Sequence, residues 1–302
     1  MSAHPPRIRV HSTEGVLVMR ESLSIHFYMR HSHEEVARAV MHALEAYSQA
    51  IAPNVLELYV DEDGSWQNLS PRSWIALQET ILTRGKAHLQ LASTGSPDWY
   101  HFSYRGRRLA APAFGDDRQN KVSAVAFWLP TEFLEERGHE SVRALVLELA
   151  KHLPFCSGHA GLSFDCEMGL VGIRQEVFSR CFRYPGLDIP DQDGISLQIG
   201  TRLRGPSWLT FLGQPVLGEL GGVAGLRARL PTPGTTVQEL EGDRAVITLG
   251  PWPEAGDTQQ GQTLPAYREL ARVLEPWLYF EQPRGHHEPS EEVRRWERRF
   301  LD

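Results

Sequence analysis

Two stretches of the chain follow the same order of local signals: an apolar strand, a breaker, an amphipathic helix, a proline and a second strand. In the first stretch, Ser32 and Glu35 form the Ser-x-x-Glu pattern of a capping box, which predicts a helix start. Apolar residues then recur at three- and four-residue steps, as on one face of a helix. This stripe consists of Val36, Val40, Ala43, Leu44, Tyr47 and Ile51. The pattern indicates a sheet with amphipathic helices packed on it.

The second stretch repeats the order with different residues. An apolar strand at 123–129 ends at Pro130, a helix begins at Ser141 and ends at Pro154, and 160–164 is typical of a strand. We therefore predict an α+β fold with mixed, mainly antiparallel sheets and packed amphipathic helices. Its two related α+β halves would be residues 1–115 and 116–281, packed as one globular unit. Residues 282–302 would form a charged tail with a short surface helix.

Composition favours a folded, cytoplasmic protein. Hydrophobic residues make up 41% and charged residues 23% of the sequence, which is ordinary for a globular chain. The longest apolar runs are too short to span a bilayer, and the N-terminus lacks the apolar region of a secretion signal. The cysteines Cys156, Cys166 and Cys181 are too few to staple 302 residues, so we expect free thiols in a reducing compartment.

The net charge of −7 bears on the kind of partner. A protein that neutralises phosphates needs a basic surface, so the charge argues against direct nucleic-acid binding. It is compatible with a basic protein partner, because complementary fields speed the encounter of two proteins.

A search for catalytic motifs finds no phosphate loop, no Gly-x-Ser-x-Gly elbow and no His-Glu-x-x-His helix. The best metal candidates are His152, Cys156, His159 and Cys166, which have zinc-ligand chemistry but lack a Cys-x-x-Cys knuckle. Core thiols and helix-end histidines explain them better. We therefore predict no enzyme, no metal and no cofactor. The alternative is a metal-dependent hydrolase that uses the His152/Cys156/His159/Asp165 region with Glu167.

Several segments have distinctive amino-acid sequences. They are 24–30, 127–130, 153–161, 181–188 and 204–213, the last of which reads Arg-Gly-Pro-Ser-Trp-Leu-Thr-Phe-Leu-Gly. Together they resemble the bacterial DUF3396 family, also described as a type VI secretion immunity family. The resemblance runs from about Arg7 to Tyr279, nearly the whole chain.

The resemblance implies an immunity protein that binds a cognate secreted toxin, often a nuclease, and blocks its active site or substrate path. The family supplies no catalytic or contact residues to transfer. From the residues alone, we predict that exposed acidic turns contact the partner, since a nuclease presents basic groups to phosphate. These residues are Asp61, Glu62, Asp63 and Trp66, then Asp188, Asp191 and Asp193. A further alternative is an effector adaptor or chaperone that binds outside the toxic domain.

Overall fold

The computed structural model describes residues 5–94, 100–109, 120–283 and 288–302. The chain divides into two compact units: unit 1 comprises residues 1–24, 157–191 and 202–302, and unit 2 comprises residues 25–156 and 192–201. The division falls within strand β2 (Leu17–Met29), between Ser24 and Ile25. These units follow other bounds than the halves 1–115 and 116–281, because one long strand contributes to both. That the two halves are related stays a prediction.

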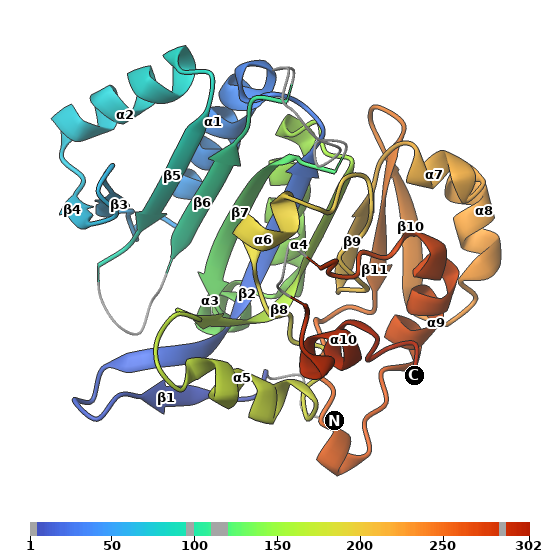
Figure 1. Ribbon diagram of the computed structural model, residues 1–302. Coiled ribbons are helices and arrows are strands. Elements are labelled where there is room, and N and C mark those ends of the chain that lie inside the picture. The colour runs from blue at the N-terminus through green and yellow to red at the C-terminus, as the bar shows by residue number, and fades with distance from the viewer. Residues whose placement is uncertain (1–4, 95–99, 110–119, 284–287) are drawn as a thin grey trace. The chain divides into compact units, whose positions relative to one another are not determined.

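Unit 2 consists of a sheet and its helices (Figure 1). Starting from its part of β2, the strands follow the order β2-β7-β6-β5-β3-β4, and the pairs from β7 to β4 are antiparallel. The strands are β3 (Leu58–Val60), β4 (Trp66–Asn68), β5 (Ala87–Ala92), β6 (His101–Gly106) and β7 (Ser123–Pro130). The helices are α1 (His33–Ala50), α2 (Pro71–Thr83), α3 (Thr131–Arg137), α4 (His139–His152) and α6 (Gln192–Ser196).

Helix α1 confirms the capping-box prediction. The main-chain N–H of Ser32 donates to the carboxylate of Glu35 at 2.6 Å. Every residue of the predicted apolar stripe is buried, so the helix presents that face to the core of unit 2. Tyr47 shows how it is fixed: its hydroxyl donates to the carbonyl of Trp128 at 2.6 Å, and its ring centroid lies 5.2 Å from that of Phe127.

Unit 1 has the strand order β10-β11-β9-β8-β2, with β1 paired to β2. The neighbours β10–β11, β11–β9 and β9–β8 are antiparallel. The strands are β1 (Arg9–His11), β8 (Ser157–Cys166), β9 (Leu209–Leu212), β10 (Thr235–Leu240) and β11 (Arg244–Leu249). The helices are α5 (Ile173–Cys181), α7 (Val216–Glu219), α8 (Gly222–Arg229), α9 (Pro265–Leu274) and α10 (Glu291–Glu297).

The C-terminal residues of unit 1 are packed, not a surface tail. Trp296 joins a buried cluster with Ile8, Phe164 and Val177, and Phe300 joins a second cluster with Tyr267. The prediction of a short helix is confirmed by α10, but its apolar face is covered. The sequence of this segment is dominated by charged residues, which led to the prediction of a tail. The two aromatic side chains, Trp296 and Phe300, pack it against the core.

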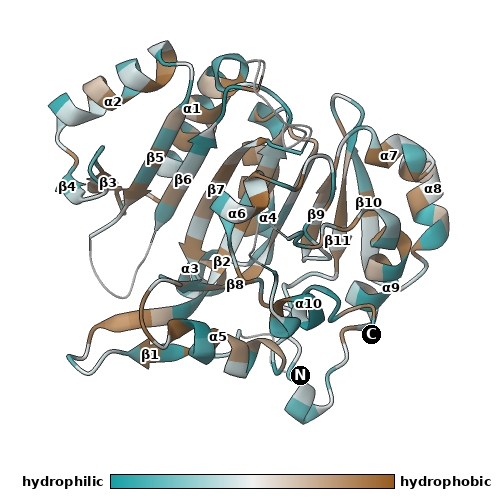
Figure 2. Cartoon of the chain, in the orientation of Figure 1, coloured by the Kyte–Doolittle hydropathy of each residue, from teal (hydrophilic) through white to brown (hydrophobic). Residues whose placement is uncertain are grey.

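Hydrophobic residues occur on strands of the sheet and also on helix α2. Figure 2 shows hydrophobic residues along β5 and β7 and on part of α2. Of the residues of helix α2, only Ile81 is buried. Among the described residues, no helix has the length and apolar character that crossing a membrane requires.

Candidate partner-binding surface

The acidic turn between β3 and β4 is organised by Asp61. Its Oδ1 accepts the N–H groups of Asp63 at 3.0 Å and Ser65 at 2.8 Å, and its Oδ2 accepts the side-chain amide of Gln67 at 2.8 Å. These hydrogen bonds, led by that from Ser65, hold the pKa of Asp61 below its ordinary value. Asp61 is therefore ionised at neutral pH, and it fixes the turn with its own oxygens.

Glu62, Asp63 and Trp66 are exposed on this turn, as are Ser65 and Gln67. The Glu62 side chain is 82% exposed, and its Oε1 accepts a hydrogen bond from Nη1 of Arg84 at 2.9 Å. Trp66 begins β4 and is 49% exposed. Gly64 has a φ of 83°, a backbone conformation that suits glycine and lets the turn close. The structure thus brings four of the predicted residues together on one exposed turn of unit 2.

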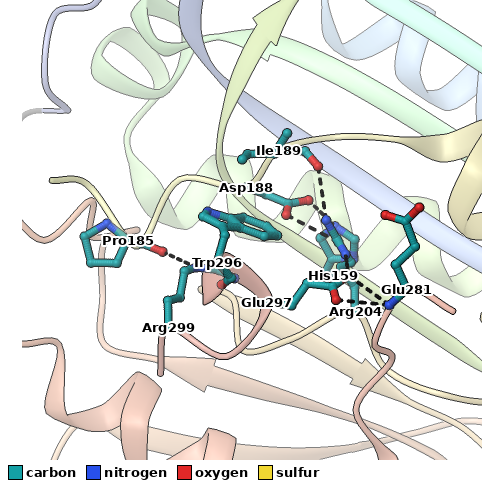
Figure 3. Close-up of polar contacts among 9 residues, drawn as sticks. All are labelled: His159, Pro185, Asp188, Ile189, Arg204, Glu281, Trp296, Glu297 and Arg299. Atoms are coloured by element: carbon teal, nitrogen blue, oxygen red, sulfur yellow. Dashed lines mark hydrogen bonds and ion pairs between the residues drawn. The ribbon is translucent and has the colours of Figure 1, made fainter. Parts of the chain in front are cut away.

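Asp188 is buried, in contrast to the expected exposed turn (Figure 3). Its Oδ2 lies 3.2 Å from Nε2 of His159 and its Oδ1 lies 3.6 Å from Nε of Arg204. Burial alone would raise the pKa of Asp188, but Arg204 and His159 outweigh it and hold that pKa well below its usual range. The sequence signal for the burial of Asp188 is its two apolar neighbours, Leu187 and Ile189, which are both buried.

The charged network around Asp188 continues into α10 (Figure 3). Nη1 of Arg204 lies 3.2 Å from Oε1 of Glu297, and the Glu297 carboxylate also accepts the N–H of Glu281 at 3.0 Å. Burial raises the pKa of Glu297, and Arg204 opposes this shift. The guanidinium carbons of Arg204 and Arg299 lie 4.8 and 3.7 Å from the Trp296 ring centroid. These groups contact and pair with one another inside unit 1, which indicates a structural role for the cluster.

The other two predicted aspartates belong to different units. Asp191 is exposed at the end of a unit 1 segment. Asp193 belongs to unit 2, where it forms an ion pair with Arg105 of β6. Partner binding by these two aspartates stays a prediction, as it does for the β3–β4 turn.

The proposed zinc ligands are engaged elsewhere. Nε2 of His152 lies 3.1 Å from Oε1 of Glu148, and Sγ of Cys156 lies 3.2 Å from the carbonyl of Tyr28. His159 faces the aspartate described above. Within the described ranges, no group of three or more His, Cys, Asp or Glu side chains is arranged to hold a metal ion. The hydrolase alternative is therefore without its candidate site in the described part of the chain.

The acid pair Asp165 and Glu167 flanks Cys166 at the end of β8. Burial, with help from both carboxylates, raises the pKa of the Cys166 thiol to about 12. Oε1 of Glu167 accepts the N–H of Gly169 at 3.2 Å. The thiol is thus protonated at neutral pH and is a poor nucleophile.

Sequence reasoning missed three exposed apolar residues of unit 2. Val55, which precedes β3, is 56% exposed. Ile75 and Leu82, both on α2, are 64% and 50% exposed. Their spacing on the helix was visible in the sequence. The sequence did not show which side of the helix is covered by the rest of the unit.

A family model matches residues 39–300: TsiV, described as type VI immunity for VRR-NUC. This chain belongs to the TsiV family. The match confirms a type VI immunity family, whereas the label DUF3396 stays a prediction. Among solved structures, this TsiV chain is similar to the Pseudomonas aeruginosa T6SS protein PA0821, with a TM-score of 0.75 and 19% identity over 99% of this chain and 88% of that one. A likeness at this identity shows the fold. A search of the curated proteins gave no match.

Proposed function

We propose that this TsiV-family protein is a stoichiometric inhibitor that binds the VRR-NUC nuclease domain of its cognate effector and covers its active site. The observation that carries the proposal is the family match over residues 39–300, which includes parts of both units. Binding alone excludes DNA from a covered active site, so the role requires no catalysis by the inhibitor.

The charge of the protein supports this role. A nuclease presents basic residues to the phosphates of its substrate. An inhibitor with a net charge of −7 is attracted to the same face, which raises the association rate and disfavours wrong partners. A specific interface of this kind buries about 1,600 Å² in total. Because a nuclease effector damages DNA, we place the protective action in the cytoplasm of the producing cell.

The test is a titration of nuclease activity. The VRR-NUC domain of the effector encoded beside this protein is incubated with labelled duplex DNA and rising amounts of the inhibitor. We expect cleavage to stop near one inhibitor per nuclease and growth of a sensitive host to be restored on co-expression. Cleavage that continues at a tenfold excess of inhibitor would contradict the proposal.

The same assay separates the adaptor alternative. An adaptor or chaperone binds the effector outside its toxic domain, so it would co-purify with the full effector and leave cleavage by the isolated nuclease domain unchanged. An enzyme would act below equimolar amounts. Inhibition that saturates at equimolar protein fits only the binding role.

A further inference from the structure

Exposed apolar side chains are concentrated in one segment of unit 2. Among the described residues, seven large apolar side chains are exposed, and four of them lie between residues 55 and 82. They are Val55, Trp66, Ile75 and Leu82. We call residues 55–83, which include β3, β4 and α2, the docking segment. Concentrations of exposed apolar side chains rimmed by polar residues are typical of protein-binding surfaces.

Helix α2 leaves its outer side uncovered. Ile75 and Leu82 are seven residues apart, which places them two turns apart on the same side of the helix. Another side of the helix is anchored: Ile81 is buried, and its carbonyl accepts a hydrogen bond from Nε2 of His33 at 2.7 Å. The helix is therefore held in place while its outer apolar residues face solvent. Such a prearranged surface loses little conformational entropy on binding.

The charge of the docking segment identifies the occupant. The docking segment contains a single basic side chain, Arg72, and Arg84 directly after it pairs with Glu62, against five acidic ones: Glu57, Asp61, Glu62, Asp63 and Glu79. A second copy of this chain would bring like charges together at this surface, which opposes self-association. Nucleic acid would be repelled for the same reason. A basic protein surface with apolar pockets fits both the charge and the exposed side chains.

We infer that the docking segment binds the DNA-binding face of the nuclease, with Trp66 as the central anchor. This inference rests on the proposed function. Trp66 supplies a large ring that is half exposed, the kind of side chain that dominates interface affinity. Glu62 and Asp63 lie beside it on the turn that Asp61 fixes, in position to meet basic groups of the nuclease. The inhibitor and DNA then compete for one surface.

Unit 1 offers a matched control for the apolar residues. Leu170 and Val171, in the turn before α5, are 46% and 104% exposed, comparable to or above the residues of the docking segment. For charge, Glu239 and Glu241 are exposed at the β10–β11 hairpin. If any exposed apolar or acidic group sufficed, the control substitutions would weaken binding as much as those in the docking segment.

The experiment measures the Kd and association rate for the VRR-NUC domain by surface-immobilised binding, at low and at physiological salt. The variants are Trp66→Ala, the double change Ile75→Ser with Leu82→Ser, and the double change Glu62→Lys with Asp63→Lys. The controls are Leu170→Ser with Val171→Ser, and Glu239→Lys with Glu241→Lys. Circular dichroism and melting temperature verify that each variant folds.

We expect Trp66→Ala to raise the Kd by about 30-fold or more, the loss typical of an interface hot spot. The Glu62/Asp63 reversal lowers the association rate at least tenfold and removes most of its salt dependence. The controls stay within threefold of the original protein. If that protein binds and inhibits while all docking-segment variants match the controls, the inference is overturned and the proposed function stands. If the original protein neither binds nor inhibits, both are wrong.

Discussion

The guanidinium of Arg299 lies against the indole ring of Trp296, with 3.7 Å between the guanidinium carbon and the ring centroid. The same side chain donates from Nε to the carbonyl of Pro185 at 2.7 Å. Trp296 itself is 2% exposed and contacts the cluster built on β8 and α5. Residues that composition marks as a charged tail therefore close the core of unit 1.

Replacing Trp296 with Ala is expected to lower the free energy of unfolding by about 3–5 kcal/mol, the cost of emptying a large aromatic site. Trp296→Phe should cost less because it keeps an aromatic ring between the two arginines. Urea unfolding followed by circular dichroism measures both. Arg294→Ala, at an exposed position of the same helix, serves as the control and should stay within about 0.5 kcal/mol of the original protein. Equal effects of Trp296→Ala and Arg294→Ala would show that α10 does not contribute to the core.

Local signals predicted the elements well. The pair Ser32 and Glu35 predicted the start of α1, and Pro154 predicted the end of the helix that the structure shows as α4, which runs to His152. The apolar run at 123–129 predicted the strand β7. Each of these signals acts within a few residues, so a single sequence contains all the information that the prediction needs.

Long-range relations could not be predicted in the same way. Asp188 is set by His159 and Arg204, which are 29 and 16 residues away, and only the folded chain brings them together. A single strand, β2, contributes to both units, and no local pattern reveals that. On α2, the sequence gives the positions of Ile75 and Leu82 but not the side that the unit covers.

Asp188→Asn should lower the free energy of unfolding at pH 7 by about 3–5 kcal/mol, because it removes the partner of a buried charge. The pKa of Asp188 is lower in the folded state than its ordinary value of 3.8, so its stabilisation is complete above that value and is lost as the pH falls below it. The stability difference between the original protein and the variant should therefore shrink below about pH 4. Urea unfolding at pH 7, 5, 4 and 3 measures the difference. A difference that stays constant over this range would exclude the ion pair as its cause.

Two glycines of unit 1 should respond differently to alanine. A Cβ on Gly186 would lie 1.9 Å from the carbonyl oxygen of Glu254, and backbone cannot move aside as a side chain can. We expect Gly186→Ala to cost about 1–3 kcal/mol or more through overpacking. A Cβ on Gly161, in buried β8, would have its nearest neighbour at 3.5 Å, an ordinary contact with Trp208. Gly161→Ala should then change stability by less than about 1 kcal/mol. Thermal unfolding of the two variants tests the contrast, and an equal loss would contradict it.

His33 links the start of α1 to the end of α2. Its Nε2 faces the carbonyl of Ile81 at 2.7 Å and must donate, so its Nδ1 accepts from the hydroxyl of Tyr104 at 2.8 Å. Burial lowers the pKa of His33 from 6.5, against the opposing effects of the Ile81 carbonyl and of Glu34. The neutral ring is thus the form that the fold requires.

His33→Gln should cost about 1–3 kcal/mol at pH 8, since two buried hydrogen bonds are lost or weakened. The folded pKa lies below the unfolded value of 6.5, so the unfolded chain binds the proton more readily and the contribution of His33 decreases as the pH falls below 6.5. The stability difference between the original protein and His33→Gln should accordingly narrow between pH 8 and 5.5. Hydrogen exchange at the amides of α2 should rise in the variant at pH 8, because Ile81 is no longer held. His11→Gln, at an exposed position of β1, is the control and should change neither quantity. Unchanged exchange in α2 would show that its position does not depend on His33.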